Sequence, residues 1–100
     1  MVQHLQNWVQ ENGLRLSERN ITCSIKAPSR ESNKLGISAS FTTDRGEATV
    51  ELWETGESDF HFLDSRSSDV GVRVTHYEFS NMQELYDALE NLLKALTSLR

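Results

Sequence analysis

An alternation of apolar and polar side chains runs through the stretch Thr49-Val50-Glu51-Leu52-Trp53-Glu54-Thr55-Gly56-Glu57. This period of two predicts a β-strand with one buried and one exposed face, because successive side chains of a strand point to opposite sides. Ala48, Val50 and Leu52 fall on the apolar face. Trp53 falls on the polar face among acidic residues, where a large amphipathic ring is favoured if another protein docks. The stretch therefore indicates a sheet with a candidate binding surface.

Neighbouring segments repeat this alternation and predict five strands, separated by polar loops at residues 28–33 and 64–69 and by turns at Asp44-Arg45-Gly46 and Gly56-Glu57. The apolar side chains of each segment share one parity, so a common inward face can be drawn. That face is expected to hold Ile21, Cys23, Ile25, Leu35, Ile37, Ala39, Phe41, Phe60, Phe62, Val70, Val72 and Val74. The outward positions of the last two strands are expected to be Asp59, His61, Leu63, Gly71, Arg73 and Thr75.

The first segment predicts an amphipathic helix over residues 2–19, because Val2, Leu5, Val9 and Leu16 keep a helical phase. The pair Asn12-Gly13 interrupts it. The helix could end there, with Gly13 as a left-handed cap. It could instead continue to Arg19, with Asn20 as the cap. The longer helix is preferred because Leu16 keeps the phase and a basic residue suits a helix end.

The last segment predicts a helix over residues 81–98. Ser80 or Asn81 can cap it, and Gln83 or Glu84 can complete a capping box. Its apolar stripe is expected to cover the apolar face of the sheet, although a homodimer seam is an alternative. Together the segments predict an α+β two-layer sandwich: a five-stranded antiparallel meander with the N- and C-terminal helices on one face. The stripe consists of Met82, Leu85, Leu89, Leu92, Leu96 and Leu99.

Composition narrows the class of protein. The 100 residues are 37% hydrophobic and 25% charged, which is typical of one globular domain. A net charge of -5 disfavours nucleic acid and anionic membranes as partners, and it suits either a basic partner or simple solubility. The single cysteine permits no internal disulfide, which fits a cytoplasmic location. Neither a signal peptide nor a membrane span is expected.

No catalytic, cofactor-binding or metal-binding motif is found in the sequence. The three histidines, His4, His61 and His76, lack the spacing of a metal site, and Cys23 has no cysteine partner. The isolated glycines make no phosphate-binding loop. The carboxylates fall at strand exteriors and turns, where no cleft is expected to set two of them in distinct environments. These observations favour a binding protein over an enzyme.

The predicted binding surface is the helix-free face of the sheet, centred on Trp53. Aromatic, arginine and polar groups together are typical of an interface core. Two alternatives remain for Trp53: it packs under a loop or helix end, or a bulge shifts the register and turns it inward. Thr75 and Tyr77 are expected on the same outer face. The predicted partner-binding residues are Trp53, Glu51, Glu54, Glu57, Asp59, His61 and Arg73.

The run Trp53-Glu54-Thr55-Gly56-Glu57-Ser58-Asp59 resembles the "tryptophan, glutamate, variable, glycine, glutamate, variable, aspartate" stretch of TriTu immunity proteins. Trp8 in the opening helix, the run Ile21-Thr22-Cys23 and the closing leucine-rich helix agree with that family. The resemblance extends over nearly the whole chain, which is then a single immunity-protein-like domain over residues 1–100. The loop at 64–68 and Asn20, where glycine is expected, depart from the pattern.

The resemblance implies a partner and a mechanism. The partner is a cognate toxin, an ADP-ribosyltransferase that modifies elongation factor Tu, and the immunity protein blocks its catalytic cleft by tight binding. No catalytic residue is implied, and the chain is expected to be a monomer or a weak homodimer. The alternative from another class is a small acidic secretion chaperone that binds an effector protein as a stable dimer. An enzyme that reverses ADP-ribosylation is a third, weaker interpretation.

Overall fold

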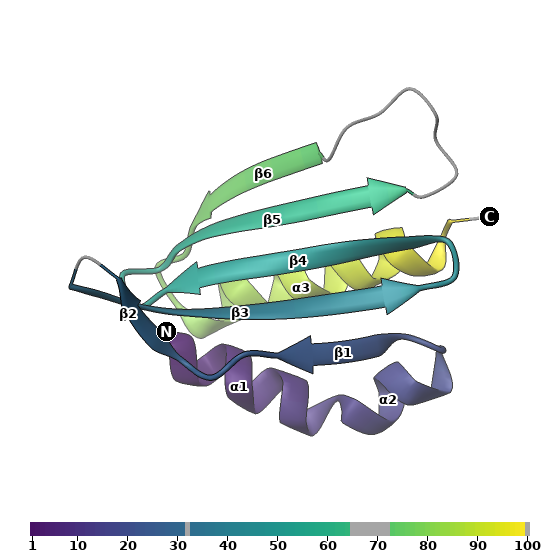
Figure 1. The fold of residues 1–100 in the computed structure, drawn as a ribbon, viewed down its shortest axis with the longest axis horizontal. Coiled ribbons are helices and arrows are strands. Elements are labelled where there is room, and N and C mark those ends of the chain that lie inside the picture. Colours follow the sequence, from purple (N-terminus) through teal and green to yellow (C-terminus); the bar gives the residue numbers. More distant parts are fainter. Residues whose placement is uncertain (32, 65–72, 100) are drawn as a thin grey trace.

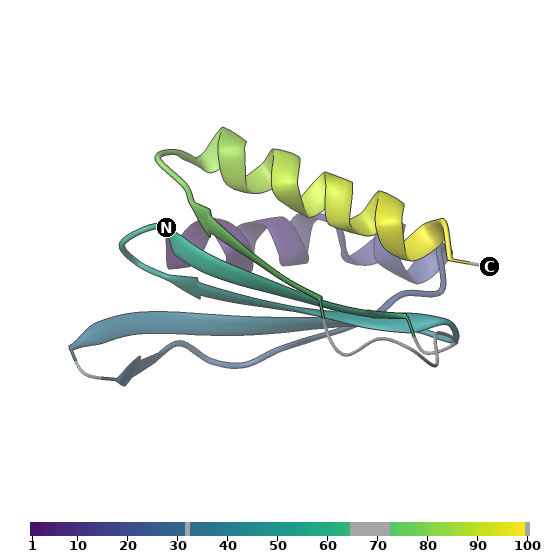
Figure 2. The same ribbon diagram turned by 90° about the horizontal axis from the view of Figure 1, so that it is seen from above.

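The computed structural model describes residues 1–31, 33–64 and 73–99, which form two layers (Figure 1). Figure 2 shows the helices together on one side of the sheet and the opposite side without a helix. The α+β sandwich with both terminal helical segments on one face is therefore confirmed. None of the described helices is long and apolar enough to cross a membrane. The helices are α1 (Val2–Glu11), α2 (Gly13–Glu18) and α3 (Met82–Thr97), and the strands are β1 (Thr22–Ile25), β2 (Ser29–Glu31), β3 (Lys34–Thr43), β4 (Gly46–Trp53), β5 (Glu57–Asp64) and β6 (Arg73–Glu78).

The sheet is antiparallel, with the strand order β1-β3-β4-β5-β6, and β2 also pairs with β3. Residues 29–31, predicted to lie in a polar loop, are thus a short strand that continues the edge begun by β1. Between the pairs Ile25↔Ala39 and Ser29↔Gly36, residues 26–28 of the edge face only residues 37–38 of β3. The extra residue makes a bulge, and Pro28 lies within it because proline has no N–H to donate to a neighbouring strand.

The N-terminal helical segment is divided at Asn12, which is the C-cap residue of α1. The backbone N–H of Asn12 donates to the carbonyl of Trp8. The first helix ends at Asn12, as one alternative predicted, but Gly13 starts α2 and is not left-handed, so the predicted glycine cap is wrong. The preferred single helix over residues 2–19 is wrong in its continuity. The predicted end is confirmed: Asn20 has a φ of 58°. The amide of Ile21 donates to the carbonyl of Leu16 at 3.0 Å, which is the closing bond of a Schellman motif.

The core lies between the helices and the inner face of the sheet. Leu85, Leu89, Leu92 and Leu96 of the predicted stripe are buried within their own chain, so the core interpretation is confirmed for them, whereas Met82 is exposed. Asn81 caps α3 as predicted, since its side chain accepts a hydrogen bond from the Glu84 amide. The fully buried side chains that fix the two layers together include Leu5, Leu16, Phe41, Val50, Leu52, Leu85, Leu89, Leu93 and Leu96.

The face assignment of the last strand is wrong. Thr75 pairs with Phe60 and Arg73 with Phe62, so both lie on the inner face, while Val74 lies on the outer face with 54% of its surface exposed. Paired residues of an antiparallel ladder share a face. The alternation of Val70, Val72 and Val74 suggested the opposite parity, but the ring of Tyr77 packs on Phe60 with centroids 4.8 Å apart and is on the inner face. Residues 65–72, which hold the predicted loop and the first two of these valines, lie outside the described residues.

Candidate protein-binding surface

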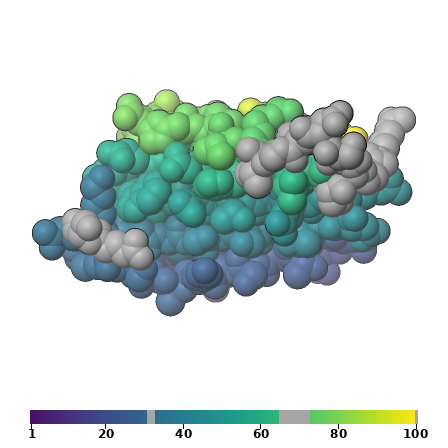
Figure 3. Space-filling model, turned by 45° about the horizontal axis from the view of Figure 1, so that its top comes forward, coloured from purple at the N-terminus to yellow at the C-terminus, as the bar shows by residue number. Residues whose placement is uncertain are grey.

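The helix-free side of the sheet, here called the outer face, is formed by alternate residues of the long strands. Figure 1 is viewed from this side, with the helices behind, and Figure 3 shows a tilted view in which the strands make one broad surface. The strand register defines its members, because paired residues point to the same side. On β3 to β6 they are Lys34, Gly36, Ser38, Ser40, Thr42, Glu47, Thr49, Glu51, Trp53, Glu57, Asp59, His61, Leu63, Val74, His76 and Glu78.

Trp53 lies on the outer face, as predicted. It pairs with Gly36 in a register that continues without a bulge from the pair Ile37↔Leu52, so the alternative of a shifted strand is wrong. The side chain is half-buried. A β-carbon built on Gly36 would lie 3.1 Å from Cδ1 and 3.2 Å from Nε1 of the indole, so the ring rests directly on the glycine. A broad rigid ring is therefore held at the surface of the sheet.

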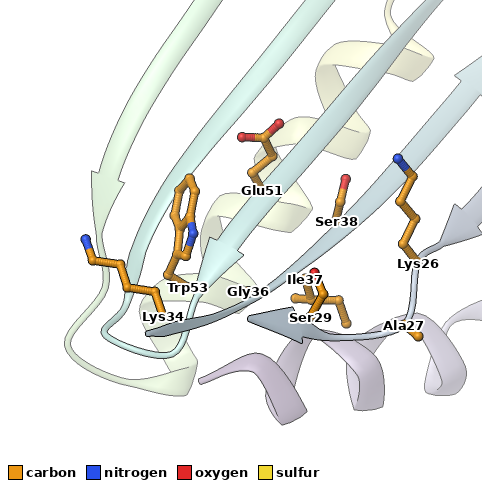
Figure 4. Close-up of a pocket in the computed structure, with 9 residues that line it drawn as sticks. All are labelled: Lys26, Ala27, Ser29, Lys34, Gly36, Ile37, Ser38, Glu51 and Trp53. Atoms are coloured by element: carbon orange, nitrogen blue, oxygen red, sulfur yellow. The ribbon is translucent and has the colours of Figure 1, made fainter. Parts of the chain in front are cut away.

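Beside Trp53 the surface is hollowed into a depression of about 290 Å³ (Figure 4). Glu51 and Ser38 project from the sheet on the same side as the indole, and Lys26 rises at the far edge. The depression therefore combines an aromatic wall with groups of both charge signs. Its lining residues are Lys26, Ala27, Ser29, Lys34, Gly36, Ile37, Ser38, Glu51 and Trp53.

Glu54 serves the helical layer instead of the outer face. One carboxylate oxygen, Oε1, lies 2.9 Å from the Met1 nitrogen, and the other, Oε2, accepts a hydrogen bond of 2.8 Å from the Val2 amide. The bond from the Met1 amino group, followed by that from Val2, lowers the pKa of Glu54. A carboxylate at this position satisfies an unpaired N–H at the start of α1 and is favoured by the helix dipole. Glu54 thus fastens the β4–β5 turn to α1.

Two further acidic residues of the outer face, both on β5, have partners on other strands of the sheet. Oε2 of Glu57 lies 3.7 Å from Nζ of Lys34. Oδ1 of Asp59 lies 2.7 Å from Nδ1 of His76, whose Nε2 is 4.0 Å from Glu78. The hydrogen bond to Asp59 raises the pKa of His76. His76 was not among the predicted partner-binding residues, and a correct register for β6 would have placed it opposite Asp59.

Glu47 and Glu51 differ from these residues. No ion pair or side-chain hydrogen bond to either carboxylate occurs among the described residues. Together with Thr49, His61 and Leu63 they line a second depression of about 260 Å³. Glu51 also lines the depression beside Trp53, so it separates the two hollows. Nε2 of His61 is buried without a hydrogen-bond partner in the described part of the chain.

Arg73 is not on the outer face. It is exposed on the helix side of β6, where it lines a depression of about 160 Å³ between the sheet and α3 together with Phe62 and Leu92. The structure therefore brings five of the predicted partner-binding residues onto one face and places two elsewhere. The five are Trp53, Glu51, Glu57, Asp59 and His61, and the two are Glu54 and Arg73.

The metal-ligating side chains and the single thiol bear on the chemistry that the described residues can support. Among the described residues, no group of three or more histidine, cysteine or acidic side chains could hold a metal ion. The thiol of Cys23 is half-buried, and burial raises its pKa, which disfavours the nucleophilic thiolate. The outer face presents the indole of Trp53, which rests on Gly36, together with several carboxylates and two depressions. These features suit contact with another protein.

The fold and the outer face define a small α+β domain whose helix-free side presents a tryptophan among carboxylates. The family model described as "Immunity protein TriTu" matches residues 3–95, and the chain belongs to this family of immunity proteins. The family name assigns it to a toxin–immunity system. No curated protein and no solved structure matches the chain.

The run of sequence that resembles the family has a physical role at each of its specified positions. Trp53 forms the aromatic wall of the outer face, and Glu54 holds the start of α1. Gly56 has a φ of 96°, and a β-carbon there would lie 2.2 Å from the Phe79 carbonyl oxygen, so only glycine fits the turn. Glu57 and Asp59 make the cross-strand ion pairs to β3 and β6. The run therefore builds the turn and one end of the surface together.

Proposed function

We propose that this protein neutralises a cognate toxin, an ADP-ribosyltransferase that modifies elongation factor Tu, by binding it stoichiometrically in the cytoplasm. The observation that carries the proposal is the match of the TriTu immunity protein family across residues 3–95. The outer face supports it, because the described residues there suit binding and form no metal-holding group. The inhibitor occupies the catalytic cleft of the toxin, and no chemical turnover is required of it.

The toxin binds on the outer face, with Trp53 near the centre of the contact. Tryptophan is enriched among the residues that dominate binding free energy, and a half-buried ring resting on Gly36 loses little conformational freedom on binding. Glu51, Glu57, Asp59 and His61 surround it on the same face. Glu54 and Arg73 act outside this contact, since Glu54 holds α1 and Arg73 lies on the helix side of β6.

A secretion chaperone is the alternative function, and the structure gives it no specific support. That function requires a stable dimer with apolar grooves for an unfolded segment. The leucine stripe of α3, which could have formed a dimer seam, is buried against the chain's own sheet. In the absence of toxin, the protein is expected to be a monomer or a weak homodimer.

The test is inhibition of a candidate ADP-ribosyltransferase toxin domain, which is sought in the genes that neighbour the one for this chain. Purified protein is titrated into a reaction in which that domain transfers ADP-ribose to elongation factor Tu. Inhibition is expected to reach completion at one protein per toxin. The proposal fails if the chain leaves transfer unchanged when it is in excess. A second arm adds a trace of the protein to elongation factor Tu that is already modified, and release of ADP-ribose there would replace the binding mechanism by an enzymatic one.

A further inference from the structure

We propose that the outer face docks a basic surface of the toxin, and that an arginine or lysine of the toxin lies against Glu51, between Trp53 and Glu47. This inference rests on the proposed function, which supplies a protein partner and leaves its surface chemistry open. Some carboxylates of the outer face already form ion pairs within the chain, and others remain for a partner to bind.

The first argument is the charge of the outer face. Its described positions on β4, β5 and β6 include no lysine or arginine. Of the lysines on this side, Lys26 lies across the depression that Trp53 lines, and Lys34 of β3 lies 3.7 Å from Glu57. A face with such an excess of one sign attracts a partner surface of the other sign and accelerates its encounter. The acidic positions are Glu47, Glu51, Glu57, Asp59 and Glu78, and this set is called the acidic strip.

The second argument is that the acidic strip is divided by its internal ion pairs. Lys34 neutralises Glu57, and His76 serves Asp59 and Glu78. The carboxylates of Glu47 and Glu51 have no such partner among the described residues. A cation brought by another protein gains most beside carboxylates that no internal cation already neutralises. The uncompensated pair on β4 is therefore where a partner cation binds.

The third argument is the shape of the surface at Glu51. This residue is half-buried and separates the depression beside Trp53 from the one over Thr49. An arginine side chain has an apolar stem and a charged head, so it can lay its stem on a ring or on Leu63 while its head meets a carboxylate. The two hollows that meet at Glu51 accommodate such side chains. An acidic partner would instead be repelled by the carboxylates of Glu47 and Glu51 on β4.

The experiment compares two double variants with the same change in net charge. Glu47→Gln with Glu51→Gln removes the uncompensated pair, and Glu11→Gln with Glu18→Gln removes two exposed carboxylates from α1 and α2 on the other layer. Association and dissociation rates with the purified toxin domain are measured by surface plasmon resonance at several salt concentrations. Circular dichroism and urea midpoints establish that each variant is folded.

The strip variant is expected to weaken binding about tenfold or more, mainly through slower association, and to flatten the dependence on salt. The helix variant should stay within about twofold of the parent. The inference is overturned if the strip variant binds like the parent at low salt, or if both variants lose affinity equally, because net charge alone would then be responsible. If the parent itself neither binds nor inhibits the toxin, the proposed function falls and this inference falls with it.

Discussion

The indole of Trp53 rests on Gly36 of the neighbouring strand, where a β-carbon would come within 3.1 Å of the ring. The missing side chain of Gly36 therefore leaves the space in which the indole lies. Gly36→Ala should leave the sheet folded, because alanine is tolerated in a strand, but the ring must move. The displacement is expected to cost about 1 kcal/mol of toxin binding, or roughly fivefold in affinity. Calorimetric titration against the toxin domain measures it, and an unchanged affinity would mean that the ring position is unimportant.

Truncation of the ring itself tests whether Trp53 is central to the contact. Trp53→Ala is expected to weaken toxin binding by about 2 kcal/mol, roughly thirtyfold, while the far-ultraviolet spectrum stays like that of the parent. Leu14→Ala is the control and should bind like the parent, since Leu14 is an exposed apolar side chain of α2 in the helical layer. An unfolded Trp53→Ala variant would show instead that the ring is a core residue.

The alternation around β4 was sufficient to predict Trp53 outward and Leu52 inward, since the strand is paired on both sides and its inner face is buried. The same reasoning failed on β6. Val74 and Tyr77 differ in parity, so apolar residues occur on both faces of that strand, and periodicity alone cannot choose between them. Packing of Tyr77 on Phe60 fixes the choice, and this contact depends on strand pairing that the sequence does not state.

The role of Glu54 was equally inaccessible from the sequence. The carboxylate meets the Val2 amide across 52 positions of the chain, and no local pattern signals such a contact. By contrast, Asn20 could be predicted as a helix end, because asparagine tolerates the left-handed backbone that the cap requires. Local backbone conformation can therefore be predicted from the sequence, whereas a contact between the two layers cannot.

Removal of the Glu54 charge should reduce stability without affecting the toxin. Glu54→Gln is expected to lower the free energy of unfolding by about 0.5 kcal/mol near neutral pH, a small value because the side chain is 54% exposed. The pKa of Glu54 is lowered in the folded chain, so its contribution is present above the ordinary value of 4.5 and is lost as the pH falls through the folded value. Urea midpoints of parent and variant should therefore converge in acid. If the variant instead loses toxin affinity, Glu54 contributes to the toxin interface.

Phe41 and Phe62 both pair with Ala48, from either side of β4, and should differ in their contribution to the core. Phe41 is fully buried, so Phe41→Ala is expected to cost about 3–5 kcal/mol of unfolding free energy. Phe62 faces inward but is only half-buried beside the depression near α3, so Phe62→Ala should cost clearly less. Urea denaturation of both variants provides the comparison. Equal losses would contradict the observed difference in burial.

Titration of His76 tests the ion pair that the sequence did not predict. The Asp59 hydrogen bond, and then the charges of Asp59, Glu78 and Glu57, raise the pKa of His76 above its ordinary value of 6.5. A raised pKa means that this residue's contribution to stability is full below 6.5 and is lost as the pH rises through the folded value. Nuclear magnetic resonance of the imidazole measures this pKa directly, and Asp59→Asn should return it toward the ordinary value.

The same titration changes the charge of the acidic strip. His76 loses its proton as the pH rises, which leaves the outer face more negative, so a basic partner should associate faster above the His76 pKa than below it. His76→Gln should remove that part of the pH dependence while the protein remains folded. Association rates with the toxin domain at pH 6 and pH 8, for parent and variant at one ionic strength, provide the measurement. Faster association of the parent at the lower pH would show that its partner is not basic at this surface.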